Sequence, residues 1–177
     1  MENMFRDLKS NEIDCRVSQI KKEWLSLLLY KDARVDQNIL DETYGPFGWQ
    51  RDHKELKGNI YCGISIFDKD KNQWVTKWDC GKESFSEAEK GEASDSFKRA
   101  GFNWGIGREL YTAPTIFIPI KDNKGQDNFE IKEEKGKLYA KTKFHVEAIQ
   151  IENKEITALS IKNNKNKRVF LYKKEGK

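Results

Sequence analysis

The sequence predicts an α+β fold in which an antiparallel β-meander carries a long helix across one face. Along residues 60–67, isoleucine and cysteine side chains alternate with a second set, at the period of two expected of a strand with distinct faces. Along residues 93–104, apolar side chains recur instead at helical spacing. A helix that follows three antiparallel strands can cross their sheet and bury such a stripe. The stripe consists of Ala93, Phe97, Ala100 and Trp104.

Two N-terminal amphipathic helices are predicted before the meander. The first covers Ser18–Tyr30, and the second ends at Gly45 and Pro46, because neither residue continues a helix well. Their apolar stripes are Ile20, Trp24, Leu27 and Leu28 in the first helix, and Val35, Ile39 and Leu40 in the second.

The meander is predicted as three strands, near 48–56, 59–68 and 72–80. The polar run from Asp68 to Asn72 is typical of the hairpin turn between two strands. Two aspartates in this run would also suit a metal-dependent nuclease. No third carboxylate lies nearby in the sequence, so the turn explains the run better.

The long helix has recognisable ends. Ser84 with Glu87, or Ser86 with Glu89, gives a capping box at its start. The Gly-Ile-Gly run at 105–107 ends it, because glycine accepts the left-handed conformation that terminates helices. This run does not indicate a dinucleotide site, since it lacks a third glycine and follows a helix rather than a strand.

Extra C-terminal strands are predicted beyond the helix. An extended segment at 114–120 precedes a polar loop at 121–128, and turns are expected at 153–154 and 163–166. The remaining strands lie near 138–151, 155–162 and 167–173.

Length and composition favour a single domain that needs no disulfide bonds to be stable. A chain of 177 residues can bury a core without disulfides, so we expect a single domain over 1–177, with a core at about 18–112 and a C-terminal strand region at about 113–173. The three cysteines form no CxxC pair and the two histidines have no partner at ligand spacing, so neither a disulfide framework nor a metal site is predicted. No apolar run is long enough to span a membrane, and we expect a soluble, cytoplasmic protein.

Positive charge is concentrated in the C-terminal third. Residues 131–177 carry 13 Lys and Arg against 6 Asp and Glu, or +7, so residues 1–130 carry −3 of the net +4. The excess is explained either by lysines that keep edge strands soluble or by a second surface that attracts phosphates. We prefer the first explanation. The clustered cations are Lys162, Lys165, Lys167, Arg168, Lys173 and Lys174.

The exposed side of the long helix carries the main functional signal. Lys98, Arg99 and Phe102 fall opposite the apolar stripe, with Asp95 one turn before Arg99. Two adjacent cations beside an aromatic ring suit a partner that is anionic and flat, as single-stranded nucleic acid is. The alternative is a solvated basic face with an Asp95–Arg99 pair. The helix alone does not separate these interpretations.

Two segments resemble a known family. The segment Lys-Gly-Glu-Ala-Ser-Asp-Ser-Phe-Lys-Arg-Ala at 90–100 is similar to the signature helix of the Rad fifty-two/twenty-two family of single-strand DNA annealing proteins. Trp-Gly-Ile-Gly-Arg-Glu-Leu-Tyr at 104–111 resembles its phage and bacterial branch. Upstream, Tyr-Lys-Asp-Ala-Arg at 30–34 and Leu-Asp-Glu-Thr-Tyr-Gly-Pro-Phe-Gly-Trp at 40–49 match a second family motif. The resemblance covers about 18–112, in the family's order and spacing.

The resemblance implies a set of DNA-binding residues. The family's Lys-Arg pair corresponds to Lys98 and Arg99, an earlier lysine to Lys90, and a tyrosine before the second helix to Tyr30. Where some members have another arginine, this chain has Phe102, which either stacks on a base or packs against a neighbouring subunit. For Tyr30, the alternative is a helix-end residue that fills the core.

Arg51 and Lys77 are cations of the meander that the family motif does not match. We include both as candidates to extend the DNA-binding groove.

The resemblance implies a DNA-handling protein rather than an enzyme. Such a protein binds single-stranded DNA and anneals complementary strands in repair and recombination, without ATP, metal or other cofactor, as a homo-oligomeric ring or filament. Replication or recombination proteins are further candidate partners, in the cytoplasm of a bacterial or phage-infected cell. Two alternatives remain: an RNA- or duplex-binding module, and a structural or regulatory protein that keeps the fold without annealing.

Overall fold

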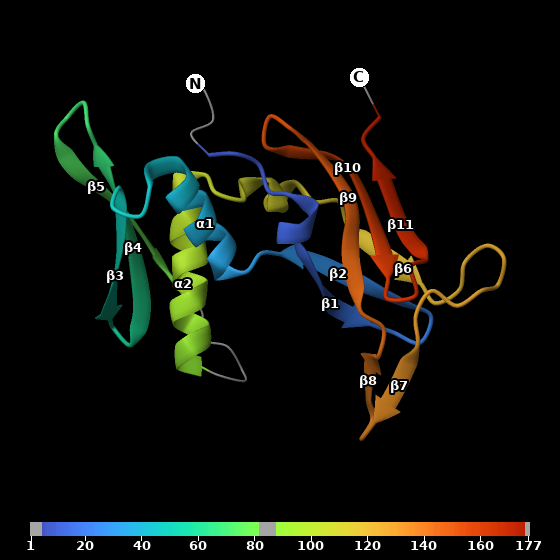
Figure 1. Cartoon of the computed structure of the whole chain (residues 1–177). Coiled ribbons are helices and arrows are strands. Elements are labelled where there is room, and N and C mark those ends of the chain that lie inside the picture. Colours follow the sequence, from blue (N-terminus) through green and yellow to red (C-terminus); the bar gives the residue numbers. More distant parts are fainter. Residues whose placement is uncertain (1–4, 82–87, 176–177) are drawn as a thin grey trace. The chain divides into compact units, whose positions relative to one another are not determined.

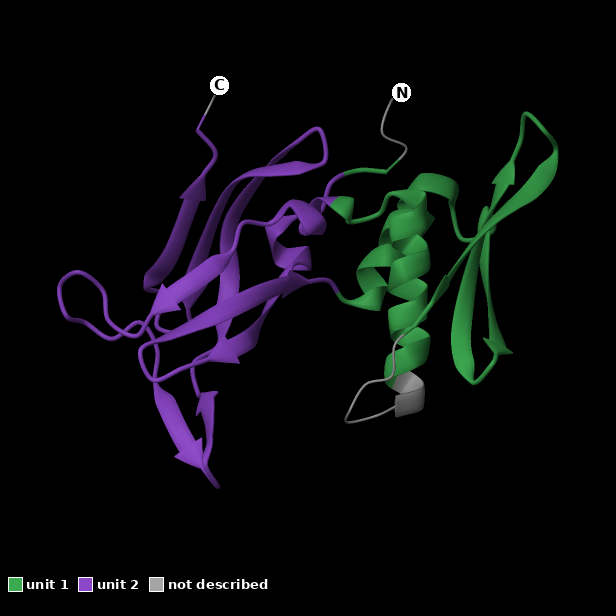
Figure 2. Cartoon of the chain, turned by 180° about the vertical axis from the view of Figure 1, so that it is seen from behind, with its two compact units in different colours: residues 1–6, 32–108 green, residues 7–31, 109–177 purple. Residues whose placement is uncertain are grey.

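The computed structural model describes residues 5–81 and 88–175, with the side chains described from residue 91 onward in the second segment. The chain forms two compact units, shown in different colours in Figure 2. Unit 1 comprises residues 1–6 and 32–108, and unit 2 comprises residues 7–31 and 109–177. Helices occur together with antiparallel strands, so the predicted α+β class is confirmed. The expectation of a single domain stays a prediction.

Unit 1 holds the meander and the long helix (Figure 1). Its strands are β3 (Trp49–Leu56), β4 (Asn59–Asp68) and β5 (Gln73–Cys80), which pair in that order as an antiparallel sheet. Each strand begins and ends within one residue of its predicted position. Local alternation was sufficient here because every pairing partner is the next strand along the chain.

The turn between β4 and β5 accounts for the two aspartates. The Asp68 carboxylate accepts hydrogen bonds of 3.1 Å from the backbone N–H groups of Asp70 and Lys71. Asn72 has a positive φ of 50°, a conformation that asparagine adopts readily. The polar hairpin turn predicted for 68–72 is therefore confirmed.

Helix α2 (Ala88–Trp104) packs across one face of the sheet. Its Phe97 is 1% exposed and its ring centre lies 6.1 Å from that of Trp49. At its C-terminal end, the Trp104 indole donates a hydrogen bond of 2.9 Å to the carbonyl oxygen of Ile64. Register places Ile64 between Arg51 of β3 and Lys77 of β5, so these two cations lie on the sheet face that α2 covers.

Capping contacts are described at both ends of α1 and at the C-terminal end of α2. Helix α1 (Ala33–Tyr44) begins after Asp32, whose Oδ1 accepts a hydrogen bond from Arg34 N at 2.8 Å. Helix α2 ends in a Schellman motif, in which Gly105 N donates to Phe102 O and Ile106 N donates to Gly101 O, each at 3.0 Å. The end predicted at 105–107 is thus confirmed. The capping box predicted for the start lies outside the described residues.

Helices α1 and α2 pack closely because Gly101 of α2 has no side chain. A Cβ atom added at Gly101 would clash with Oδ1 of Asp36, which is fully buried on α1. Ile39 and Leu40 of α1 are also fully buried. Helix α1 is the second predicted helix, and its end at Tyr44, before Gly45, is confirmed.

Unit 2 is built on a six-stranded antiparallel sheet with the order β11-β10-β9-β1-β2-β6. Leu25, Ile118, Ile156 and Ile161 are fully buried in it. The six strands are β1 (Asp14–Ile20), β2 (Trp24–Tyr30), β6 (Ile116–Pro119), β9 (Phe144–Glu152), β10 (Glu155–Asn163) and β11 (Arg168–Lys173). The chain also contains the hairpin β7 (Ile131–Glu134) and β8 (Lys137–Ala140), and the short 3₁₀ helices η1 (Ser10–Glu12) and η2 (Arg108–Thr112).

The prediction of a helix over Ser18–Tyr30 is wrong. This segment lies in the β1–β2 hairpin, whose turn is closed by a hydrogen bond of 2.8 Å from Lys21 N to Trp24 O. Leu25 and Leu27 are buried and alternate with more exposed neighbours, which is the period of a strand. Strand β2 pairs with β6, far along the chain, and a local helical pattern cannot report such a partner.

The prediction of one strand over 138–151 is also wrong. The segment is interrupted at 141–143, so β8 pairs with β7 and β9 pairs with β10 and β1. Strand β7 was not predicted. Gly136, with a φ of 74°, makes the β7–β8 turn, and the paired carboxylates and lysines of this hairpin obscure its alternation.

No helix among the described residues combines the length and apolar character that crossing a membrane requires.

Candidate nucleic-acid interface

Lys98 and Phe102 lie on the side of α2 away from its buried stripe. Both are half-buried, whereas Phe97 and Ala100 are buried. Hydrogen bonds from Arg34, together with the positive charge of Lys98, lower the pKa of Asp32 below its usual value. The charge of Lys98 therefore acts on the residue that caps the N-terminal end of α1.

Arg99 has a partner on the sheet. Its Nε lies 3.2 Å from Asp79 Oδ1, and the two side chains are 37% and 23% exposed. Asn103, one turn later, donates to the other Asp79 oxygen at 3.2 Å and to Trp78 O at 3.0 Å. The Arg99–Asp79 ion pair therefore links α2 to β5, and Asp79 neutralises part of the Arg99 charge.

Lys77 and Arg108 meet the C-terminal end of α2. Lys77 Nζ donates to Asn103 O at 3.0 Å and lies 4.3 Å from the centre of the Trp104 ring. Arg108 donates to Phe102 O at 2.7 Å and to Asn103 O at 3.0 Å. Cations at this position stabilise the negative end of the helix dipole. The sequence had not suggested a role for Arg108, although it directly follows the glycines that end the helix.

Arg51 and His53 of β3 border a surface hollow of about 380 Å³. The Arg51 guanidinium lies 5.1 Å from the centre of the Phe97 ring, and His53 Nε2 lies 3.4 Å from the carbonyl oxygen of Ala93. The hollow is lined by Ala33, Arg51, His53, Ala93, Ser94 and Phe97. It thus joins the first residue of α1, strand β3 and the first half of α2.

Two further predicted site residues, Tyr30 and Lys90, stay predictions. Tyr30 ends strand β2 of unit 2 and is 39% exposed, so it is neither a helix-end residue nor fully buried in the core. Lys90 belongs to the first turn of α2, but its side chain lies outside the described part of the structure. The structure therefore gathers Arg51, Lys77, Lys98, Arg99 and Phe102 around α2 within unit 1.

Most of the C-terminal cations have carboxylate partners. Lys162 and Arg168 both bind Glu147, at 2.9 and 2.6 Å, and Lys167 lies 2.9 Å from Asp122. Lys165 pairs with Glu130 and Lys174 with Glu155, each at 2.6 Å. These pairs favour the interpretation of solubilising charge over that of a second phosphate-attracting surface.

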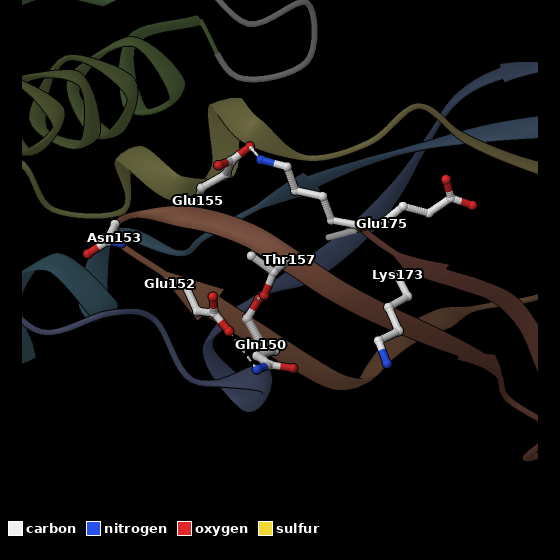
Figure 3. Close-up of a pocket in the computed structure, with 8 residues that line it drawn as sticks. Gln150, Glu152, Asn153, Glu155, Thr157, Lys173 and Glu175 are labelled. Atoms are coloured by element: carbon white, nitrogen blue, oxygen red, sulfur yellow. Dashed lines mark hydrogen bonds and ion pairs between the residues drawn. The ribbon is translucent and has the colours of Figure 1, made fainter. Parts of the chain in front are cut away.

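A second hollow, of about 480 Å³, lies over β9, β10 and β11 of unit 2 (Figure 3). Acidic and basic side chains border it together, and Gln150 donates to Glu152 at 2.8 Å within it. Such a mixed lining does not select an anion. Its lining includes three glutamates and two lysines: Glu152, Glu155, Glu175, Lys173 and Lys174.

An aromatic surface of unit 1 was missed by sequence reasoning. Phe47 is 94% exposed in the turn between α1 and β3, and Trp74 of β5 is 44% exposed. A hollow of about 540 Å³ lies between them, lined by Thr43, Tyr44, Phe47, Gly48, Phe67, Lys69 and Trp74. The signal available in the sequence was a phenylalanine inside a Gly-Pro-Phe-Gly turn, where an apolar side chain cannot be buried by its own element.

Among the described residues, no three His, Cys, Asp or Glu side chains lie close enough together to hold a metal ion.

An aromatic ring beside cations on a core-docked helix is typical of a surface that binds single-stranded nucleic acid. Residues 1–129 match the family model described as Rad52/22 family double-strand break repair protein. Because this match covers well over half of the chain, the protein belongs to that family, and the predicted family resemblance is confirmed. A comparison with curated proteins finds no match.

Proposed function

We propose that the protein binds single-stranded DNA along α2 and anneals complementary strands, without ATP, in DNA repair and recombination. Membership of the double-strand break repair family carries this proposal. The meander with a basic helix across it is then the annealing core of that family. The phage and bacterial branch is the one that the 104–111 motif favours.

Annealing requires no nucleophile and no bond cleavage. It needs a surface that holds the phosphate chain by cations and leaves the base edges open to a complementary strand. Lys98, Lys90 and Arg99 supply the charge in this proposal, Arg51 and Lys77 extend it, and Tyr30 or Phe102 offers a ring to a base. Because bound cations release counterions from DNA, affinity falls steeply with salt concentration.

Assembly belongs to the same proposal. Three to five cations per protomer neutralise only a few phosphates, so a single protomer binds weakly at physiological salt. Neighbouring protomers on one strand raise the overall affinity through their linked sites. A ring or filament of identical subunits in the cytoplasm, working with replication or recombination proteins, provides such linkage.

The decisive experiment measures annealing directly. Two complementary oligonucleotides, one labelled with a fluorophore and one with a quencher, are mixed with the protein in a chelator and without nucleotide. We expect pairing faster than the spontaneous rate, together with a multimer by light scattering. No acceleration would contradict the proposal, as would acceleration by a preparation that is strictly monomeric.

Competition identifies the preferred nucleic acid. Unlabelled single-stranded DNA, RNA and duplex DNA are each added to a complex with labelled single-stranded DNA. We expect single-stranded DNA to displace the label best. Stronger displacement by RNA or by duplex would favour the alternative binding module.

A further inference from the structure

We infer that the hollow between α1, β3 and α2 receives a phosphate group of the bound strand, so that the strand follows the α1–β3 side of α2. This inference rests on the proposed binding of single-stranded DNA and names the path and two further contacts, His53 and Ser94. Arg99 and Lys77, which bind partners on the β5 side of the helix, then contribute less to DNA binding than the residues of the hollow.

Polar groups from two elements converge on this hollow. Arg51 and His53 extend from β3, two residues apart and therefore on the same face of the sheet. Ser94 lies on α2 one turn before Lys98, so the serine hydroxyl and the lysine occupy the same side of the helix. A guanidinium, an imidazole and a hydroxyl group thus border one opening of about 380 Å³.

The opening suits an anion rather than an apolar group. The Arg51 guanidinium lies on the Phe97 ring, which leaves the N–H groups at its edge directed outward. Among the described residues, no carboxylate forms an ion pair with Arg51, whereas Asp79 forms one with Arg99. Asp32, the residue before the Ala33 that lines the hollow, is already bound by Arg34 at 2.8 Å.

The opposite side of α2 is occupied by contacts within the protein. Arg99 binds Asp79, and Lys77 and Arg108 bind the last carbonyl oxygens of the helix. A phosphate on that side would have to displace these partners. On the α1–β3 side the phosphate would displace no ion pair among the described residues, only the 3.4 Å contact between His53 Nε2 and Ala93 O, so the strand binds there at lower cost.

The two histidines of the chain allow a direct test. His53 borders the hollow, whereas His145 lies on β9 of unit 2. The ring ¹H–¹³C signals of both are followed while an oligothymidylate is added, and binding is measured in parallel by fluorescence anisotropy. We expect the His53 signals to shift and saturate together with the anisotropy, and the His145 signals to stay in place.

Two failures are distinguishable in this experiment. Anisotropy that reports binding while the His53 signals do not move would overturn the hollow and leave the proposed function intact. Anisotropy that reports no binding at all would remove the proposed function itself, and the inference with it.

Matched variants test which side of α2 the bound strand follows. Arg51→Gln removes a charge at the hollow, and Lys54→Gln removes one from the same strand on the opposite face, where Lys54 lies 4.4 Å from the centre of the Trp78 ring. We expect Arg51→Gln to weaken binding and reduce the salt slope by about one counterion, and Lys54→Gln to change neither. Equal losses in both variants, or a greater loss in Lys77→Gln with the fold intact, would overturn the assigned path.

Discussion

Adjacent cations on α2 have different environments. Lys98 and Arg99 are neighbours in the sequence, yet Arg99 forms an ion pair with Asp79 on β5 whereas the charge of Lys98 acts on Asp32 at the start of α1. Successive helical residues differ by about 100° around the axis, so a pair of cations divides between two sides. The two substitutions should therefore have separable effects.

We expect Lys98→Ala to weaken single-stranded DNA binding and lower its salt slope by about one counterion, with no change in the urea midpoint. Arg99→Ala should lower the free energy of unfolding by about 0.5–1 kcal/mol, because it leaves Asp79 without its cation. A double-mutant cycle with Asp79→Ala measures the coupling. Unchanged DNA binding in Lys98→Ala, or zero coupling between Arg99 and Asp79, would contradict this division of roles.

At the scale of elements, the contact between α1 and α2 depends on Gly101. Alanine is intrinsically favoured over glycine in a helix by about 1 kcal/mol. A Cβ at this position would clash with Asp36. This overpacking is expected to cost about 1–3 kcal/mol, which is more than the gain in helix propensity.

We therefore predict that Gly101→Ala destabilises the protein in urea unfolding, against the helix propensity. Ser94→Ala, at an exposed position of the same helix, serves as the control and should be neutral or slightly stabilising. A Gly101→Ala variant more stable than the parent would show that α1 can move away from α2 without loss.

Ion pairs within unit 2 make its stability sensitive to acid. Hydrogen bonds from Arg168 and then Lys162 lower the pKa of Glu147 far below its ordinary value of 4.5. A hydrogen bond from Lys167, supported by backbone N–H groups, lowers the pKa of Asp122 from 3.8 to about 2. In both cases the folded state binds protons less readily than the unfolded chain. These pairs therefore stabilise fully above the ordinary carboxyl pKa and lose that contribution as pH falls toward 2.

We expect the urea midpoint of unfolding to fall steadily between about pH 5 and about pH 2, and Glu147→Gln to flatten this dependence. Glu133→Gln, on the exposed face of β7, is the matched control and should keep the parent's pH profile. A Glu147→Gln profile identical to that of the parent would show that the cross-strand pairs contribute nothing to stability.

At the scale of the whole molecule, an exposed aromatic group suits a contact between subunits. Phe47 is 94% exposed in a turn that Gly45 begins with a positive φ of 72°. The turn also contains Pro46, so the chain around Phe47 has little freedom to lose on binding. Aromatic side chains are enriched at the centres of protein interfaces.

We predict that Phe47→Ser leaves the melting temperature unchanged, because little buried area is lost, and lowers the oligomer mass measured by light scattering together with the annealing rate. Leu171→Ser, at a site 69% exposed on β11, is the control for removal of a surface apolar group. A Phe47→Ser variant that assembles and anneals like the parent would place the subunit contact elsewhere.

The strands and the helix ends of unit 1 could be predicted from the sequence. Strands β3, β4 and β5 pair with their neighbours along the chain, and the ends of α1 and α2 carry their own glycine signals. Each of these features depends on residues within one or two turns, so local alternation and helical spacing determine them. The family motifs at 40–49 and 90–100 lie in this same unit.

Tertiary structure decided the rest. The segment 18–30 becomes a hairpin because β2 pairs with β6, and Leu25 meets Ile118 across a separation that no local pattern encodes. In the same way, sheet register brings Asp79 to Arg99 and sets Arg51 and His53 beside Ser94. The sequence by itself determined which residues carry charge on α2. Which of those charges stay available to a ligand was decided by partners that only the folded chain brings within contact distance.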